Sequence, residues 1–60
     1  MKPLTSPMHF HTAMIEQIPV AVFMGQEMVG SGKIIEITDY SVKIGDEFYV
    51  REACTFKYAV

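Results

Sequence analysis

Residues 28–50, MVGSGKIIEITDYSVKIGDEFYV, decide the fold of this chain. Apolar and polar residues alternate along most of the stretch, which is typical of strands with one buried face. A long strand is predicted from Met28 to Tyr40, and Gly30 and Gly32 interrupt it. Glycines inside a strand mark a bulge or a sharp bend. A long bent strand in a short chain indicates a small open barrel, because curling the sheet removes exposed edges.

The end of the same stretch predicts a β-hairpin. Val42 and Ile44 form the apolar face of its first strand, and Phe48 and Val50 form that of its second. Residues directly opposite one another share a face, so we expect a three-residue loop, Gly45-Asp46-Glu47. The expected cross-strand pairs are Ile44 with Phe48, Lys43 with Tyr49, Val42 with Val50 and Ser41 with Arg51.

A short helix is predicted before the strands. Ser6 is a typical N-cap and Pro7 suits the first helical position, so the helix should occupy residues 8–17. Pro19 disfavours a helical conformation at the residue before it and ends the segment there. The side chains expected on the inner side of the helix are those of Phe10, Met14 and Ile15.

Two further strands complete the predicted fold. The alternating segment 18–24 forms the first strand, and residues 25–27 turn the chain into the bent strand. After the hairpin, residues 52–55 make a turn that leads to a last strand over 56–60. The predicted fold class is therefore mainly β, with a five-stranded, strongly bent open barrel and a short N-terminal helix.

The last strand carries an apolar face made by Phe56, Tyr58 and Val60. No following segment is expected to cover this strand. An apolar edge strand pairs with another chain unless it is protected, so the strand predicts self-assembly.

Chain length leads to the same expectation. Sixty residues form one domain, with an N-terminal segment over 1–17 and the barrel over 18–60. A domain of this size buries only about 60% of its unfolded surface, and disulfides, metals or partner subunits usually supply the missing stability. Cys54 is the only cysteine, and His9, His11 and Cys54 are one ligand short of a structural zinc site. No metal or cofactor is therefore predicted, and a homo-oligomer is.

Charge and composition limit the function. The formal net charge is −2, which argues against a protein that coats nucleic acid non-specifically. The single thiol suits the cytoplasm, and neither a signal peptide nor a membrane span is expected. The seven carboxylates are scattered along the chain, and so small a barrel has no interior room for a substrate. An enzyme is therefore not predicted.

Two motifs carry a family resemblance. Val22-Phe23-Met24 and Gly32 match the start of one motif, and Val50-Arg51-Glu52 matches the other. The residues that follow Gly32 in register are Ile34, Ile37, Tyr40, Val42 and Ile44. On this spacing residues 18–58 resemble the Sm-like family of Sm, Lsm and Hfq proteins, which form small RNA-binding rings. The departures from the family pattern are Thr38 for the motif Asp, Val42 for the Asn, and Glu52 for the final Gly or His.

The resemblance implies a homo-oligomeric ring of about five to seven subunits, closed by pairing of strand four with strand five of the next subunit. It also implies binding of short single-stranded RNA, with Tyr40 as the base-stacking residue and Arg51 as the basic residue. Ser41 and Lys43 would support this pocket. The implied interface residues are Phe48, Val50, Phe56, Tyr58 and Val60. A bacterial or phage source fits a compact member of this family.

Other interpretations stay open. Tyr40 could instead cap the barrel with a buried ring, and Arg51 could form a surface ion pair with Asp39 or Glu52. The acidic balance also suits an oligomeric adaptor that binds protein partners and has lost the RNA site. A monomeric SH3-like peptide module is a third interpretation, although the sequence lacks clustered surface aromatics for proline-rich segments.

Overall fold

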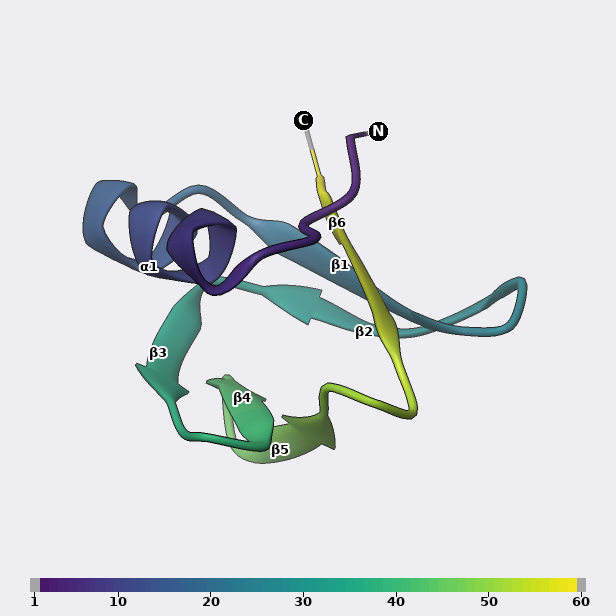
Figure 1. Ribbon diagram of the computed structural model, residues 1–60. Helices are drawn as coiled ribbons and strands as arrows, with labels where there is room; N and C mark the ends of the chain where they lie inside the picture. The colour runs from purple at the N-terminus through teal and green to yellow at the C-terminus, as the bar shows by residue number, and fades with distance from the viewer. Residues whose placement is uncertain (1, 60) are drawn as a thin grey trace.

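The computed structural model describes residues 2–59, with one helix and six strands in two three-stranded antiparallel sheets (Figure 1). One sheet has the order β2-β1-β6 and the other has the order β3-β4-β5. The elements are α1 (Pro7–Glu16), β1 (Val20–Met24), β2 (Glu27–Gly32), β3 (Ile34–Ile37), β4 (Ser41–Ile44), β5 (Glu47–Val50) and β6 (Thr55–Tyr58). The prediction of a mainly β fold with a short N-terminal helix is confirmed, and the described strands form two sheets without a closed barrel.

The predicted long strand over 28–40 is divided between the two sheets. β2 ends at Gly32 and β3 begins at Ile34, so the chain passes from one sheet to the other at Lys33. Gly32 has a φ of +147°, a conformation that favours glycine. The glycine prediction of a bend is therefore correct, but the bend separates two strands of different sheets.

The helix begins where the sequence predicts. Ser6 is its N-cap with extended backbone angles, and Pro7 occupies the first turn. The Nδ1 atom of His9 accepts hydrogen bonds from the backbone N–H groups of Thr5 at 3.0 Å and Ser6 at 3.3 Å. His9 thus takes the place that a glutamate or glutamine usually has in a capping box.

We expect His9→Ala to lower the free energy of unfolding by about 1 kcal/mol, the usual cost of losing a helix cap. His9→Gln should restore most of the loss, because glutamine at this position accepts the same N–H groups. The matched control is His11→Ala, since His11 is exposed on the same helix. Urea unfolding followed by circular dichroism measures all three variants, and equal losses for the two alanine variants would contradict the capping role.

The core lies between α1 and the two sheets. The fully buried β-branched side chains are Val20, Val22 and Val42. Phe10 and Ala13 from α1 are buried, and α1 lies against β3 (Figure 1). The prediction that Ile15 faces inward is wrong, because Ile15 is exposed while Ala13 takes the inner position.

The β4–β5 hairpin has a different register from the predicted one. Its loop is the two-residue turn Gly45-Asp46, with Gly45 at φ +62°, the geometry of a type II′ hairpin turn. The observed pairs are Ile44 with Glu47, Lys43 with Phe48, Val42 with Tyr49 and Ser41 with Val50. Tyr49 therefore shares a face with Val42, and Phe48 and Val50 turn outward.

Gly30 explains why Tyr49 takes the inner position. A Cβ atom at Gly30 would overlap the Tyr49 hydroxyl and would lie 2.8 Å from the ring carbon that carries it. The missing side chain in β2 thus makes room for the Tyr49 ring from β5. Strict alternation of apolar residues favoured Phe48 and Val50 as the inner pair, and this long-range contact overrides it.

The outer edge of β6 is paired within the chain, contrary to the prediction that nothing covers it. The Leu4 N–H donates to the Phe56 carbonyl at 2.8 Å, and the Tyr58 N–H donates to the Lys2 carbonyl at 2.8 Å. Pro3 and Lys57 form an antiparallel bridge between these bonds. Residues 2–4 run beside β6, so the N-terminal segment and the last strand lie together (Figure 1).

Among residues 2–59 no helix is both long enough and apolar enough to cross a membrane.

Candidate functional site

A shallow depression of about 660 Å³ lies where the N-terminal segment, α1 and the loops before β4 and after β5 meet. It contains both residues that the sequence predicts as the centre of a base pocket, Tyr40 and Arg51. The side chains that line it are those of Pro3, Leu4, Thr5, Pro7, Phe10, Asp39, Tyr40, Arg51, Glu52, Cys54, Thr55 and Phe56. Residues from both ends of the sequence therefore build one open surface.

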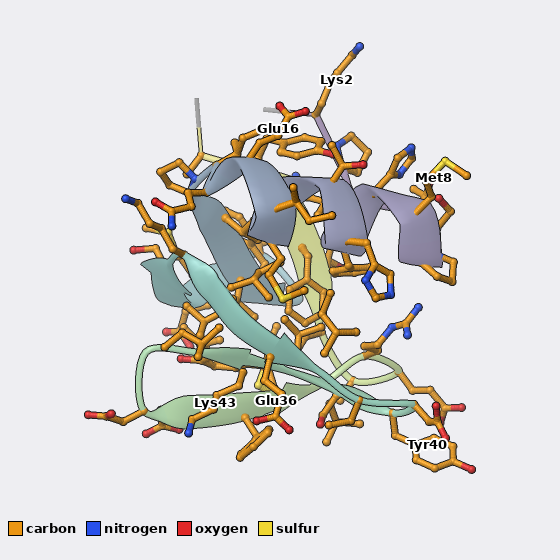
Figure 2. All side chains as sticks on the ribbon, turned by 90° about the vertical axis from the view of Figure 1, so that its left-hand side faces the viewer. Lys2, Met8, Glu16, Glu36, Tyr40 and Lys43 are labelled. Atoms are coloured by element: carbon orange, nitrogen blue, oxygen red, sulfur yellow. The ribbon has the colours of Figure 1, made fainter. Side chains whose placement is uncertain are left out.

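Tyr40 and Arg51 are held next to each other by the backbone. The Arg51 N–H donates to the Tyr40 carbonyl at 2.8 Å, so the two residues extend the β4–β5 ladder by one pair. The Tyr40 side chain is 77% exposed. Figure 2 shows it at the edge of the molecule, directed away from the body of the protein. The interpretation of Tyr40 as a buried cap of the barrel is therefore wrong, and its ring is accessible to a ligand.

Arg51 lies against the helix. The Arg51 Cζ atom is 4.9 Å from the centroid of the Phe10 ring, within the range of a cation–π contact. Phe10 is buried and meets Phe56 edge to face, with 5.1 Å between ring centroids. The guanidinium therefore rests on a rigid aromatic support, which keeps it beside the depression.

The loop that carries Tyr40 is organised by Thr38. The Thr38 hydroxyl oxygen accepts hydrogen bonds from the backbone N–H groups of Ser41 at 2.9 Å and Tyr40 at 3.3 Å. It also lies 2.7 Å from the Ser41 hydroxyl. These contacts form a side-chain-to-backbone turn of the kind that serine and threonine stabilise. The Thr38 hydroxyl thus supplies the acceptor that orders this loop.

The other two predicted pocket residues have different positions. Ser41 contacts Thr38 and supports the loop without lining the depression. Lys43 lies on the outer face of the β3-β4-β5 sheet, with Nζ 5.4 Å from the centroid of the Phe48 ring. Figure 2 shows Lys43 beside Glu36 and well apart from Tyr40. The structure thus brings Tyr40 and Arg51 together and leaves Lys43 elsewhere.

The five predicted interface residues differ in exposure. Phe48 and Val50 are about half exposed on β5, as an interface would require. Phe56 is buried in the core of its own chain, and Tyr58 is half-buried with its hydroxyl 3.5 Å from the His9 carbonyl. Val60 lies outside the described residues.

The electrostatic character of the depression is mixed. Arg51 is its one cation, and Asp39 and Glu52 are its two anions, so the described lining carries a net charge of −1. Cys54 is a free, half-buried thiol in the wall. No group of three or more metal-ligating side chains gathers within residues 2–59. Asp39 and Glu52 therefore oppose the approach of a bare phosphate to Arg51.

Sequence reasoning missed the part of the site made by the N-terminal segment. Leu4, Thr5 and Pro7 line the depression, and Phe10 supports Arg51. The sequence signals only that Phe10 is apolar at a helical position, which predicts burial but not its partner. Phe10 and Arg51 are 41 residues apart along the chain, so no local pattern indicates their contact.

Comparisons of the chain with protein-family models, curated proteins and solved structures found no match.

Proposed function

We propose that this protein is an Sm-like subunit that binds short single-stranded RNA, with one unpaired base in the depression at Tyr40 and Arg51. The observation that carries the proposal is the exposed Tyr40 ring held next to Arg51 at the rim of an open depression. A base would stack on the Tyr40 ring, and the Arg51 guanidinium would donate to the base edge or to the adjoining phosphate.

The strand order supports an Sm-like interpretation. Each sheet has two outer strands, and β5 and β6 are among them, with residues 2–4 paired to the outer edge of β6. These are the predicted fourth and fifth strands, the two that the resemblance pairs between neighbouring subunits. The exposed Phe48 and Val50 side chains on β5 agree with a second chain at that strand.

Assembly would matter for affinity. One base stacked on an aromatic residue contributes about 1–3 kcal/mol, which by itself gives only weak binding. A ring of about five to seven identical depressions would bind one RNA strand at several sites, and effective concentration would strengthen the complex.

Tyr40→Ala tests the proposal. We expect it to weaken binding of fluorescein-labelled oligo-U or oligo-A by about tenfold or more, because the stacking surface is lost. The solution mass and the unfolding midpoint should not change, since the Tyr40 side chain packs against little of the protein. Fluorescence anisotropy at a fixed salt concentration measures the binding, and light scattering measures the mass.

Two further variants make the result specific. Tyr40→Phe keeps the ring and should bind like the original chain. Lys43→Ala removes a cation that lies outside the depression, and binding should be nearly unchanged. A loss in Lys43→Ala as large as that in Tyr40→Ala would show general electrostatic attraction instead of a base site.

A second candidate is an oligomeric adaptor for protein partners. The observation in its favour is the outer face of the β3-β4-β5 sheet, where Ile35, Phe48 and Val50 are all more than half exposed. Absence of any oligonucleotide binding by the original chain, together with a stable oligomer, would favour this candidate over RNA binding.

A further inference from the structure

The outer edge of β6 accepts an extended segment. Its Phe56 carbonyl and Tyr58 N–H bond to residues 2–4, at 2.8 Å in both cases. The Leu4 side chain enters the core beside this edge and is 6% exposed. The acceptor site therefore has two parts, a row of backbone groups and an apolar place for the side chain of the residue that bonds to Phe56.

The outer edge of β5 is the complementary part. β5 pairs with β4 on one side, and no other described strand pairs with it. In a hairpin with a two-residue turn, the pair next to the turn, Ile44 and Glu47, is hydrogen-bonded, and the pairs then alternate along the strands. Phe48 and Val50 therefore stand in non-hydrogen-bonded pairs, and their backbone N–H and C=O groups point away from β4. On the outward side the Val50 carbonyl accepts from the Ala53 N–H at 3.2 Å. The Phe48 backbone and the Val50 N–H remain available to a further strand.

Residues 2–4 and β5 have the same alternation of backbone and side-chain directions. Leu4 turns its backbone toward β6 and its side chain into the core. Phe48 and Val50 combine outward backbone groups with apolar side chains on one face, and these side chains are 52% and 51% exposed. If Phe48-Tyr49-Val50 of a second copy took the position of residues 2–4, both exposed apolar side chains would lie on the side of the sheet on which Leu4 lies.

We propose that residues 2–4 are an intrachain strand that competes for the outer edge of β6 with β5 of a second copy, the strand that the family resemblance already pairs with this edge. This inference rests on the proposed function, because it assumes that the chain assembles, and it adds that residues 2–4 control the assembly. With residues 2–4 docked, the β6 edge is closed and assembly through it stops. When they leave, β5 of another copy takes the edge by β-augmentation, and the repeated head-to-tail contact builds the oligomer.

A disulfide lock tests the competition. Pro3 and Lys57 form a non-hydrogen-bonded antiparallel pair, in which the Cα atoms lie about 4.5 Å apart, within the range that a disulfide spans. The variant carries Pro3→Cys and Lys57→Cys, with Cys54→Ser to prevent wrong pairing. Oxidation fixes residues 2–4 on β6, and reduction releases them.

The expected result is a change of mass with redox state. The reduced variant should have the mass of several copies, and the oxidised variant should be a monomer up to a concentration at least about tenfold higher. Light scattering at several concentrations measures both. Cys54→Ser alone should match the original chain under both conditions. Equal masses in the two redox states overturn the proposal, whether the common mass is that of a monomer or of an oligomer.

A pair of surface variants identifies the partner strand. Val50→Asp places a charge on β5, and Ile35→Asp places the same charge on β3, where Ile35 is 59% exposed. We expect Val50→Asp to make the reduced variant monomeric and Ile35→Asp to leave its mass unchanged. Loss of assembly in both aspartate variants would assign the contact between copies to the outer face of the β3-β4-β5 sheet. It would overturn the proposal that β5 replaces residues 2–4 on β6. Oligonucleotide binding that is lost in Tyr40→Ala while the two redox states have equal mass would leave the proposed function standing without this inference.

Discussion

Replacing Phe56 with alanine is expected to lower the free energy of unfolding by about 3–5 kcal/mol, the usual cost of removing a buried phenylalanine. Phe56 is 2% exposed and meets Phe10 edge to face. A chain of 60 residues has about 3–9 kcal/mol of stability in total, at roughly 0.05–0.15 kcal/mol per residue. Phe56→Ala should therefore leave much of the protein unfolded at 25 °C.

Phe48→Ala is the matched control, because Phe48 was also predicted as an interface residue. Its side chain is half exposed, so the loss should be within about 0.5 kcal/mol in the monomer. Urea unfolding at low protein concentration measures both variants, with circular dichroism as the probe. A small effect of Phe56→Ala would mean that the residue faces a partner instead of its own core. A large effect of Phe48→Ala at low concentration would place that residue in the core.

Gly30→Ala is expected to destabilise the protein by about 1–3 kcal/mol or more, through overpacking against Tyr49. The new Cβ would overlap the Tyr49 hydroxyl, and the ring carbon that bears it would lie 2.8 Å away. Neither β2 nor β5 can shift freely, since each is paired in its own sheet. The Tyr49 ring would have to leave its inner position and would expose apolar surface beside Val42.

A double-mutant cycle shows whether Tyr49 is the cause. Tyr49→Leu shortens the side chain, so Gly30→Ala should cost less when it is combined with Tyr49→Leu than when it is made alone. Thermal unfolding of the four chains gives the coupling free energy. Additive losses would mean that Gly30→Ala acts on the local strand backbone and not through Tyr49. The space at Gly30 would then not be the reason for the hairpin register.

Local signals in the sequence determined the elements. Ser6 and Pro7 mark the helix start because the N-cap and the first turn depend on neighbouring residues alone. Gly32 carries the signal of a bend, but at the hairpin the alternation of apolar residues led to a three-residue loop where the structure has the two-residue turn Gly45-Asp46. The alternation of apolar residues predicted where strands lie. The helix start and the bend rest on backbone preferences of short segments, which is why they could be predicted without knowledge of distant residues.

The candidate site was predicted only in part. The prediction placed Tyr40 and Arg51 near each other but paired Ser41 with Arg51, and the direct Tyr40–Arg51 pair follows from the two-residue loop that the structure shows. The aromatic support under Arg51 does not, since Phe10 comes from the helix at the other end of the chain. Lys43 was placed with the pocket by its nearness in sequence to Tyr40, but the strand directs it to the outer face of the sheet.

The sequence by itself determined the class of fold, the helix start and the bend at Gly32, whereas the predicted loop length and register of the β4–β5 hairpin were wrong. Only the tertiary structure decided which face of β5 is buried and what covers the outer edge of β6. Tyr49 points inward because a glycine on another strand leaves room for its ring. Residues 2–4 close the β6 edge because Leu4 finds a buried place beside Phe56. Both outcomes depend on the packing of residues far apart in the chain, and alternation within one strand carries no information about that packing.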